Sequence, residues 1–171
     1  GDNLRKIFKF NKYTYNERAS IAKKFGADVP FMRPKKLATD NAGYSDALFH
    51  GINKLKSLGY EFEILTIRDC TVPFIRISDI VNSIDLLRNS NCNAVYGVYK
   101  QHLNPYFNMM ETNSNGFLNL CKKLKFPIRR RQDAPVVYQL NGLFTMYVDK
   151  FLKYKTTLMP KVLPYEIPPE T

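Results

Sequence analysis

Segments with helical periodicity alternate with strand-like segments along this chain, and this alternation restricts the fold more than any other feature. Three helical segments begin at residues that can cap a helix, namely Asn16, Ser45 and Ser78. The first two end at a glycine, Gly26 and Gly59. The strand-like segments are Lys12–Tyr15, Glu61–Ile67, Ala94–Tyr99 and Leu143–Val148, and Lys150–Tyr154 has the pattern of a helical turn. This order predicts an α/β fold of three layers with a mainly parallel sheet.

The chain has no internal repeat and no Gly/Ser-rich linker, so residues 1–171 are interpreted as one domain. The segment 99–132 differs from the rest because it is rich in asparagine and has little periodicity. We interpret it as a hairpin-like excursion from the sheet and as a candidate dimerisation arm. In parallel sheets, ligands bind beyond the carboxyl ends of the strands. The loops after Ile67 and Tyr99 are therefore the places to look for chemistry.

The charge balance favours an anionic partner. The chain carries 26 Lys and Arg against 15 Asp and Glu, a net charge of +11. A nucleotide, a phosphosugar, a nucleic acid or an acidic lipid surface would suit this balance, and general solubility is the alternative. Three widely spaced cysteines, Cys70, Cys92 and Cys121, fit free thiols in a reducing compartment. With no apolar run long enough to cross a bilayer and no leader pattern, a cytoplasmic location is expected.

Three segments with polar or charged residues, which we call polar stations, follow predicted helices or strands. The first holds Arg33, which Pro34 forces out of the helical region, and Asp40; it could grip a phosphate or a ribose, or be a surface arginine with a turn former. The second, Arg68–Arg76, follows a strand and includes Asp69 and Thr71; the alternative is an ordinary connection to the next helix.

The third station is the most basic part of the chain. Six basic residues and no acid lie between Thr112 and Gln132, and Tyr138–Gly142 follows. This run could be a cationic wall for phosphate or carboxylate, or a solvated charge run, and Asn141-Gly142 could be a tight turn. If the basic triplet is extended, Arg129 shares a face with Arg131, and Arg130 faces away. His50 and His102 have no companion pattern and are interpreted as structural.

Taken in order, the stations resemble a known family, the acylneuraminate cytidylyltransferases, or CMP-nonulosonate synthetases. The residues that carry the resemblance are the runs Ile21–Pro34 and Leu37–Ala42, then Arg130–Pro135 and Tyr138–Gly142, and more loosely Asp69–Arg76. The resemblance extends over nearly the whole chain from about Lys12 onward. It implies a nucleotidyltransferase (Rossmann-like) fold, a homodimer, and a requirement for CTP, a nonulosonic acid and Mg²⁺.

The resemblance also implies roles for individual residues. Arg33, Asp40 and Thr71 match positions on the nucleotide side. The matches on the acidic-sugar side are Arg131, Gln132, Gln139 and Asn141. The implied reaction is attack of the sugar's anomeric hydroxyl on the α-phosphorus of CTP, which gives a CMP-sugar and pyrophosphate.

Several departures from the family pattern bear on activity. No glycine-rich, Arg/Lys-bearing loop precedes Asn11, no aspartate pair follows the Pro-Tyr-Glu-Ile-Pro-Pro-Glu region, and Gln139 stands where many members have arginine. The chain also begins with Gly1 rather than Met. We therefore expect either a fragment of an active enzyme or a degenerate relative, with little turnover of its own, because phosphoryl transfer depends on positioning and charge neutralisation.

Two other classes of function are compatible with the sequence. One is a non-catalytic relative that binds a nucleotide or an acidic sugar. The other is a basic RNA-binding module, since 11 Tyr and 12 Phe could stack on single-stranded bases, although no RRM, KH or OB signature occurs. The salt dependence of binding distinguishes an RNA-binding module from a sugar- or nucleotide-binding relative, because nucleic-acid binding weakens steeply with ionic strength.

Overall fold

The computed structural model describes residues 15–39, 43–69, 71–72, 74–125 and 128–168. The chain divides into two compact units, Gly1–Glu61 (unit 1) and Phe62–Thr171 (unit 2). Each unit is described by itself.

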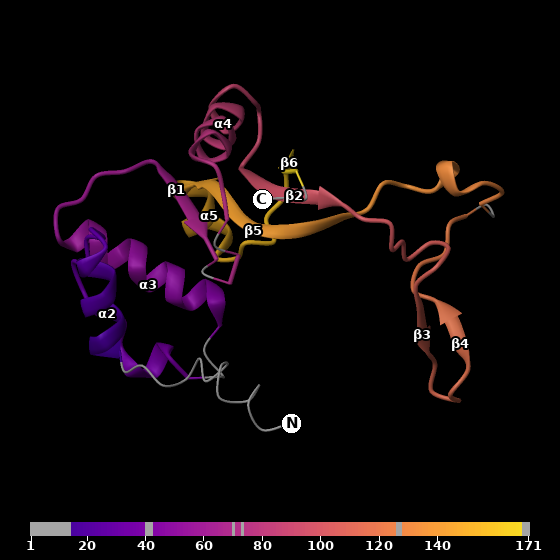
Figure 1. The fold of residues 1–171 in the computed structure, drawn as a ribbon, viewed down its shortest axis with the longest axis horizontal. Helices are drawn as coiled ribbons and strands as arrows, with labels where there is room; N and C mark the ends of the chain where they lie inside the picture. Colours follow the sequence, from indigo (N-terminus) through magenta and orange to yellow (C-terminus); the bar gives the residue numbers. More distant parts are fainter. Residues whose placement is uncertain (1–14, 40–42, 70, 73, 126–127, 169–171) are drawn as a thin grey trace. The chain divides into compact units, whose positions relative to one another are not determined.

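The described part of unit 1 contains two α-helices that end in the same way (Figure 1). Helix α2 covers Tyr15–Lys24 and helix α3 covers Tyr44–Ser57, and a 3₁₀ turn, η1, lies between them at Lys35–Leu37. Gly26 and Gly59 follow the helices with φ of +85° and +87°, so both helices stop at the predicted glycines. In each case the residue after the glycine donates to a carbonyl five positions back, as in a Schellman motif.

The helix starts in unit 1 differ from the predicted ones. Asn16 and Ser45 lie inside the first turns of α2 and α3, and Gly43 is the N-cap of α3. Tyr15 is helical, so the predicted strand Lys12–Tyr15 is wrong at this residue, and its other residues lie outside the described part. His50 on α3 meets the Phe31 ring edge to face at 5.9 Å, a packing contact that agrees with a structural role.

Unit 2 is built on a four-stranded sheet in the order β1-β5-β2-β6. The strands are β1 (Ile64–Arg68), β2 (Ala94–Lys100), β5 (Tyr138–Tyr147) and β6 (Val162–Glu166). Strands β1, β2 and β6 run in one direction, and β5 runs in the opposite direction between β1 and β2. The unit is therefore mixed α/β, and the prediction of a mainly parallel sheet missed the reversed strand.

Helices α4 (Ile77–Arg88) and α5 (Val148–Tyr154) pack against this sheet (Figure 1). The core includes fully buried side chains from both helices and from the two central strands, among them Leu87, Val95, Leu143, Met146 and Phe151. Strand β6 was not predicted, because Pro164 interrupts its pattern. Its neighbour in the sheet order is β2 on one side alone, and a proline is tolerated on such an edge strand.

The asparagine-rich segment forms its own two-stranded antiparallel hairpin, β3 (Met110–Thr112) with β4 (Leu118–Leu120). Figure 1 shows the hairpin apart from the four-stranded sheet of unit 2. Asn113 closes its turn by accepting the backbone N–H groups of Asn115 and Phe117, each at 3.0 Å. Asn104 and Asn108 likewise bond nearby backbone, so asparagine in this segment shapes turns. Asn104 Nδ2 also donates to the Pro135 carbonyl, 31 positions away.

Candidate functional site

Three strands of the unit 2 sheet end, and a fourth begins, on the same side of the sheet. We call this side, where the strand ends lie, the sheet edge. Strands β1, β2 and β6 end there at Arg68, Lys100 and Glu166, and the reversed strand β5 begins there at Tyr138. Its first three residues are exposed, although most of the strand is buried. This is the edge at which α/β sheets bind ligands.

A hollow of about 430 Å³ opens at this edge, and we call it the edge hollow. It is lined by Tyr99, Lys100, Gln101, His102, Glu166, Ile167 and Pro168. Two contacts join its wall to the start of β5. Gln101 Nε2 donates to Gln139 Oε1 at 2.8 Å, and the Tyr138 hydroxyl donates to Glu166 Oε1 at 2.7 Å. The hydrogen bond to Glu166 raises the pKa of Tyr138 above its ordinary value.

Beside this edge, Asn141 is held by an arginine from the neighbouring strand. Arg68 Nη1 donates to both Asn141 Oδ1 and the Asn141 carbonyl oxygen, each at 2.8 Å, and Arg68 Nη2 donates to the Phe74 carbonyl at 2.8 Å. Asn141 is 1% exposed. Arg68 Nε and Asn141 Nδ2 are buried without a partner in the structure. Burial lowers the pKa of Arg68, but a guanidinium stays charged.

Two glycines make room for this arrangement. A Cβ on Gly97 would lie 2.8 Å from Asn141 Oδ1, Leu143 Cβ and Ile167 Cδ1. Gly142 has φ of +83°, and a Cβ there would lie 2.9 Å from Asp69 Cβ. Since both Asn141 and Gly142 lie inside β5, the alternative of a tight turn at Asn141-Gly142 is wrong.

The loop after β1 separates the residues of the second station. Thr71 is exposed in a turn, and the Asp69 backbone N–H donates to the Gly142 carbonyl at 2.9 Å. Arg76 turns instead to Asp79, with Nε 3.1 Å from Oδ2, and Tyr165 also donates to this buried carboxylate. The hydrogen bonds from Arg76 lower the pKa of Asp79, with a smaller contribution from Tyr165. The N-cap of α4 is Arg76, and not the predicted Ser78, and the Arg76 N–H donates to the side chain of Asp79 in the first turn at 3.4 Å.

The residues of the third station lie in two different places in unit 2. Gln139 and Asn141 belong to the sheet edge, whereas Arg131 and Gln132 lie in a 3₁₀ turn, η2 (Arg131–Asp133), before β5. The Arg131 guanidinium lies over the Phe107 ring at 5.3 Å. Arg130 pairs with Asp133 at 3.0 Å. The expected extended triplet is therefore wrong, because the turn begins at Arg131.

The remaining predicted residues lie in or beside unit 1. Arg33 is exposed in the coil between α2 and η1, and Asp40 lies outside the described residues. Sequence reasoning did not single out Arg68, Tyr138 or Glu166. Arg68 stood at the start of the second station, and Tyr138 at the start of a quoted run, so both carried a signal. Glu166 carried none, because its strand was not predicted.

The described residues contain no group of three or more His, Cys, Asp or Glu placed to hold a metal ion. None of the helices in the described part is long and apolar enough to cross a membrane.

Two curated proteins are similar to this chain. A post-translational flagellin modification protein B of Campylobacter coli is 28% identical over 150 residues, which are 85% of this chain and 61% of that protein. A CMP-N,N'-diacetyllegionaminic acid synthase of Campylobacter jejuni is 30% identical over 141 residues, which are 80% of this chain and 57% of that protein. The chain thus spans less than two-thirds of either relative. No protein-family model matches it. The two similarities confirm the resemblance that the motifs indicated.

Proposed function

We propose that this chain, a relative of the nonulosonic acid cytidylyltransferases, contributes the acidic-sugar side of a CMP-sugar synthase. The observation that supports this most is the meeting of Gln139, Asn141 and the edge hollow at the ligand-binding edge of the sheet. In the proposed reaction, the anomeric oxygen of the sugar bonds to the α-phosphorus of CTP. The bond from that phosphorus to the β-phosphate oxygen breaks, pyrophosphate leaves, and the hydroxyl proton passes to solvent.

Each residue has a proposed role that follows from where it lies. Gln139 and Gln101 offer amide groups to sugar hydroxyls, and Lys100 at the edge hollow offers a cation. Asn141 is buried, so we propose that it acts from below, by holding the end of β1 through Arg68. Arg131 would bind the sugar carboxylate, and Gln132 beside it would bind a sugar substituent. Arg33, Asp40 and Thr71 are assigned to CTP by resemblance. Mg²⁺ remains a proposed requirement, and no step here is assigned to it.

Substitution of Arg131 tests the assignment of the sugar side. Arg131→Lys keeps the charge but loses the planar fork that matches a carboxylate. We expect sialic or legionaminic acid to bind about 10- to 150-fold more weakly, which corresponds to the roughly 1.5–3 kcal/mol of a hydrogen bond to a charged group. CTP binding should stay unchanged. Titration calorimetry with each ligand measures both affinities.

Two control variants make the result specific. Arg130→Lys alters an arginine that pairs with Asp133, and it should leave sugar binding unchanged. Arg33→Lys should weaken CTP binding and leave the sugar curve unchanged. If Arg131→Lys weakens CTP binding and spares the sugar, the assignment is wrong. Binding of both ligands without formation of CMP-sugar would favour the non-catalytic relative.

We further propose that the hairpin carries the contact of a homodimer. Its exposed apolar side chains include Met110, Phe117 and Leu118, with Phe117 70% exposed. Several large apolar side chains exposed on one short hairpin favour association. Light scattering at micromolar concentration should give twice the mass of one chain, and Phe117→Ser with Leu118→Ser should give a monomer. Leu158→Ser, a control at an 84% exposed leucine after α5, should leave the mass unchanged. A monomeric wild-type chain would refute the proposal.

A further inference from the structure

A second hollow, of about 480 Å³, lies beside the hairpin, and we call it the lysine pocket. It is lined by Tyr106, Phe107, Leu120, Lys122, Lys123, Leu124, Lys125 and Ile128. These residues come from the segment before β3 and from the end of β4 and the segment after it. Two backbone bonds tie the segments together, from Cys121 N to the Met109 carbonyl at 3.1 Å and from Lys122 N to the Pro105 carbonyl at 2.9 Å. The pocket therefore has a hydrogen-bonded frame.

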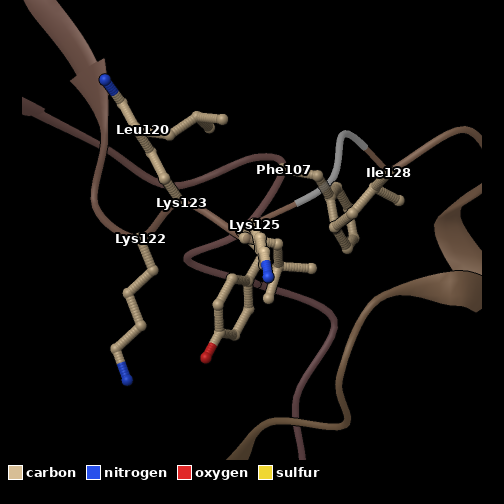
Figure 2. Close-up of a pocket in the computed structure, with 8 residues that line it drawn as sticks. Phe107, Leu120, Lys122, Lys123, Lys125 and Ile128 are labelled. Atoms are coloured by element: carbon tan, nitrogen blue, oxygen red, sulfur yellow. The ribbon is translucent and has the colours of Figure 1, made fainter.

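The walls of the lysine pocket combine two kinds of chemistry. Leu120, Leu124 and Ile128 provide an aliphatic surface, and the three lysines provide cations around it. Figure 2 shows the ammonium groups of the lysines pointing in three different directions. A ligand that satisfies both has an aliphatic part with anionic groups on more than one side of it.

The aromatic rings of the pocket already have cationic partners. Lys122 Nζ lies 5.7 Å from the centre of the Tyr106 ring, and Arg131 lies 5.3 Å from the centre of the Phe107 ring. These cation–π contacts occupy one face of each ring and hold the cations in place. A nucleic-acid base would have to compete with them in order to stack there. The aromatic residues thus favour an anion near the cations over a stacked base.

The charge of the surrounding sequence also favours an anionic ligand. The sequence between Thr112 and Gln132 carries six basic residues and no acid, and the whole chain carries +11. Pairing of this pocket with the same pocket of a second copy would bring like charges together, so the homodimer contact proposed above is assigned to the apolar side chains of the hairpin and not to this pocket. Charge complementarity points instead to a strongly acidic partner.

We propose that the lysine pocket docks an acidic segment of another protein, with one aliphatic side chain between Leu120, Leu124 and Ile128 and flanking carboxylates on the lysines. The carboxylates supply steering and orientation, and the buried aliphatic side chain supplies affinity. The proposed docking uses neither the edge hollow nor the start of β5, and it adjoins the proposed sugar side at one point, where Arg131 lies over the Phe107 ring of the pocket.

Fluorescence anisotropy with two labelled peptides tests the docking. The first peptide is Asp-Glu-Leu-Glu-Asp and the second is Asp-Glu-Ser-Glu-Asp, which has the same charge. We expect the leucine peptide to bind roughly tenfold more tightly, as burial of one leucine allows. Leu124→Ser should remove that preference, and Lys123→Glu with Lys125→Glu should weaken both peptides at least about tenfold. The control pair Lys54→Glu with Lys56→Glu, on α3, should leave both affinities within about twofold.

Several results would overturn the proposal. Equal binding of the two peptides would reduce the pocket to a general anion surface. Tighter binding of a single-stranded oligonucleotide, with displacement of the leucine peptide, would assign it to nucleic acid. A change of mass in light scattering on Lys123→Glu with Lys125→Glu would assign it to contact between copies. Far-UV circular dichroism of each variant shows that a lost affinity is not a lost fold.

Discussion

Replacing Arg68 with methionine is expected to lower the free energy of unfolding of unit 2 by about 3–5 kcal/mol. The change removes three hydrogen bonds of 2.8 Å from one guanidinium. It also leaves Asn141 Oδ1 buried without a donor, because Asn141 is 1% exposed. An orphaned buried acceptor costs the full desolvation of that group, so the loss exceeds the value of an average hydrogen bond.

Urea unfolding followed by circular dichroism measures this loss. Arg88→Met is the matched control, because Arg88 is an exposed residue in the last turn of α4, and it should change stability by a few tenths of a kcal/mol. The double variant Arg68→Met with Asn141→Leu replaces both partners by apolar groups, and it should recover part of the loss. A loss equal to that of Arg88→Met would show that Arg68 does not support the site edge.

Replacing Gly97 with alanine is expected to destabilise unit 2 by about 3 kcal/mol, the upper end of the usual cost of overpacking. The added Cβ would lie 2.8 Å from Asn141 Oδ1, Leu143 Cβ and Ile167 Cδ1. Leu143 Cβ is attached directly to the central strand, so it moves only if the backbone moves. The register of β2 on β5 shifts between Tyr96 and Val98, so the pairing of the two strands is already irregular at Gly97.

The control for Gly97→Ala is a glycine whose replacement by alanine should stabilise the protein instead of destabilising it. Gly51 lies inside α3, and a Cβ there would meet Phe31 Cζ at an ordinary 3.8 Å. Gly51→Ala should therefore stabilise unit 1 by about 0.5–1 kcal/mol, the helix-interior difference between the two residues. Thermal unfolding of both variants by calorimetry resolves the two effects. Gly97→Ala with wild-type stability would mean that the strand relaxes freely, contrary to the close packing described.

The edge of the sheet illustrates how far the candidate site could be predicted. The rule that ligands bind beyond strand ends directed attention to the segments after Ile67 and Tyr99, and Tyr99 to His102 do line the edge hollow. The run Tyr138–Asn141 was singled out by its resemblance, and it begins the strand that meets the same edge. Glu166 was missed because Pro164 concealed β6.

Local chemistry explains what the sequence determined by itself. The ends of α2 and α3 at Gly26 and Gly59 follow from glycine's access to positive φ, which involves neighbours in the chain alone. The charge of +11 and the basic run before Gln132 are also properties of composition. These features need no knowledge of distant residues.

Tertiary structure decided the direction of β5 and the environment of Asn141. A strand pattern specifies period and burial but no direction, so the reversal of β5 between β1 and β2 was not visible. Asn141 meets Arg68 across 73 positions of the chain, and Gly97 must lack a side chain for the two to fit. Such contacts depend on which strands become neighbours, because packing and hydrogen bonding between distant segments exist only once the sheet has formed.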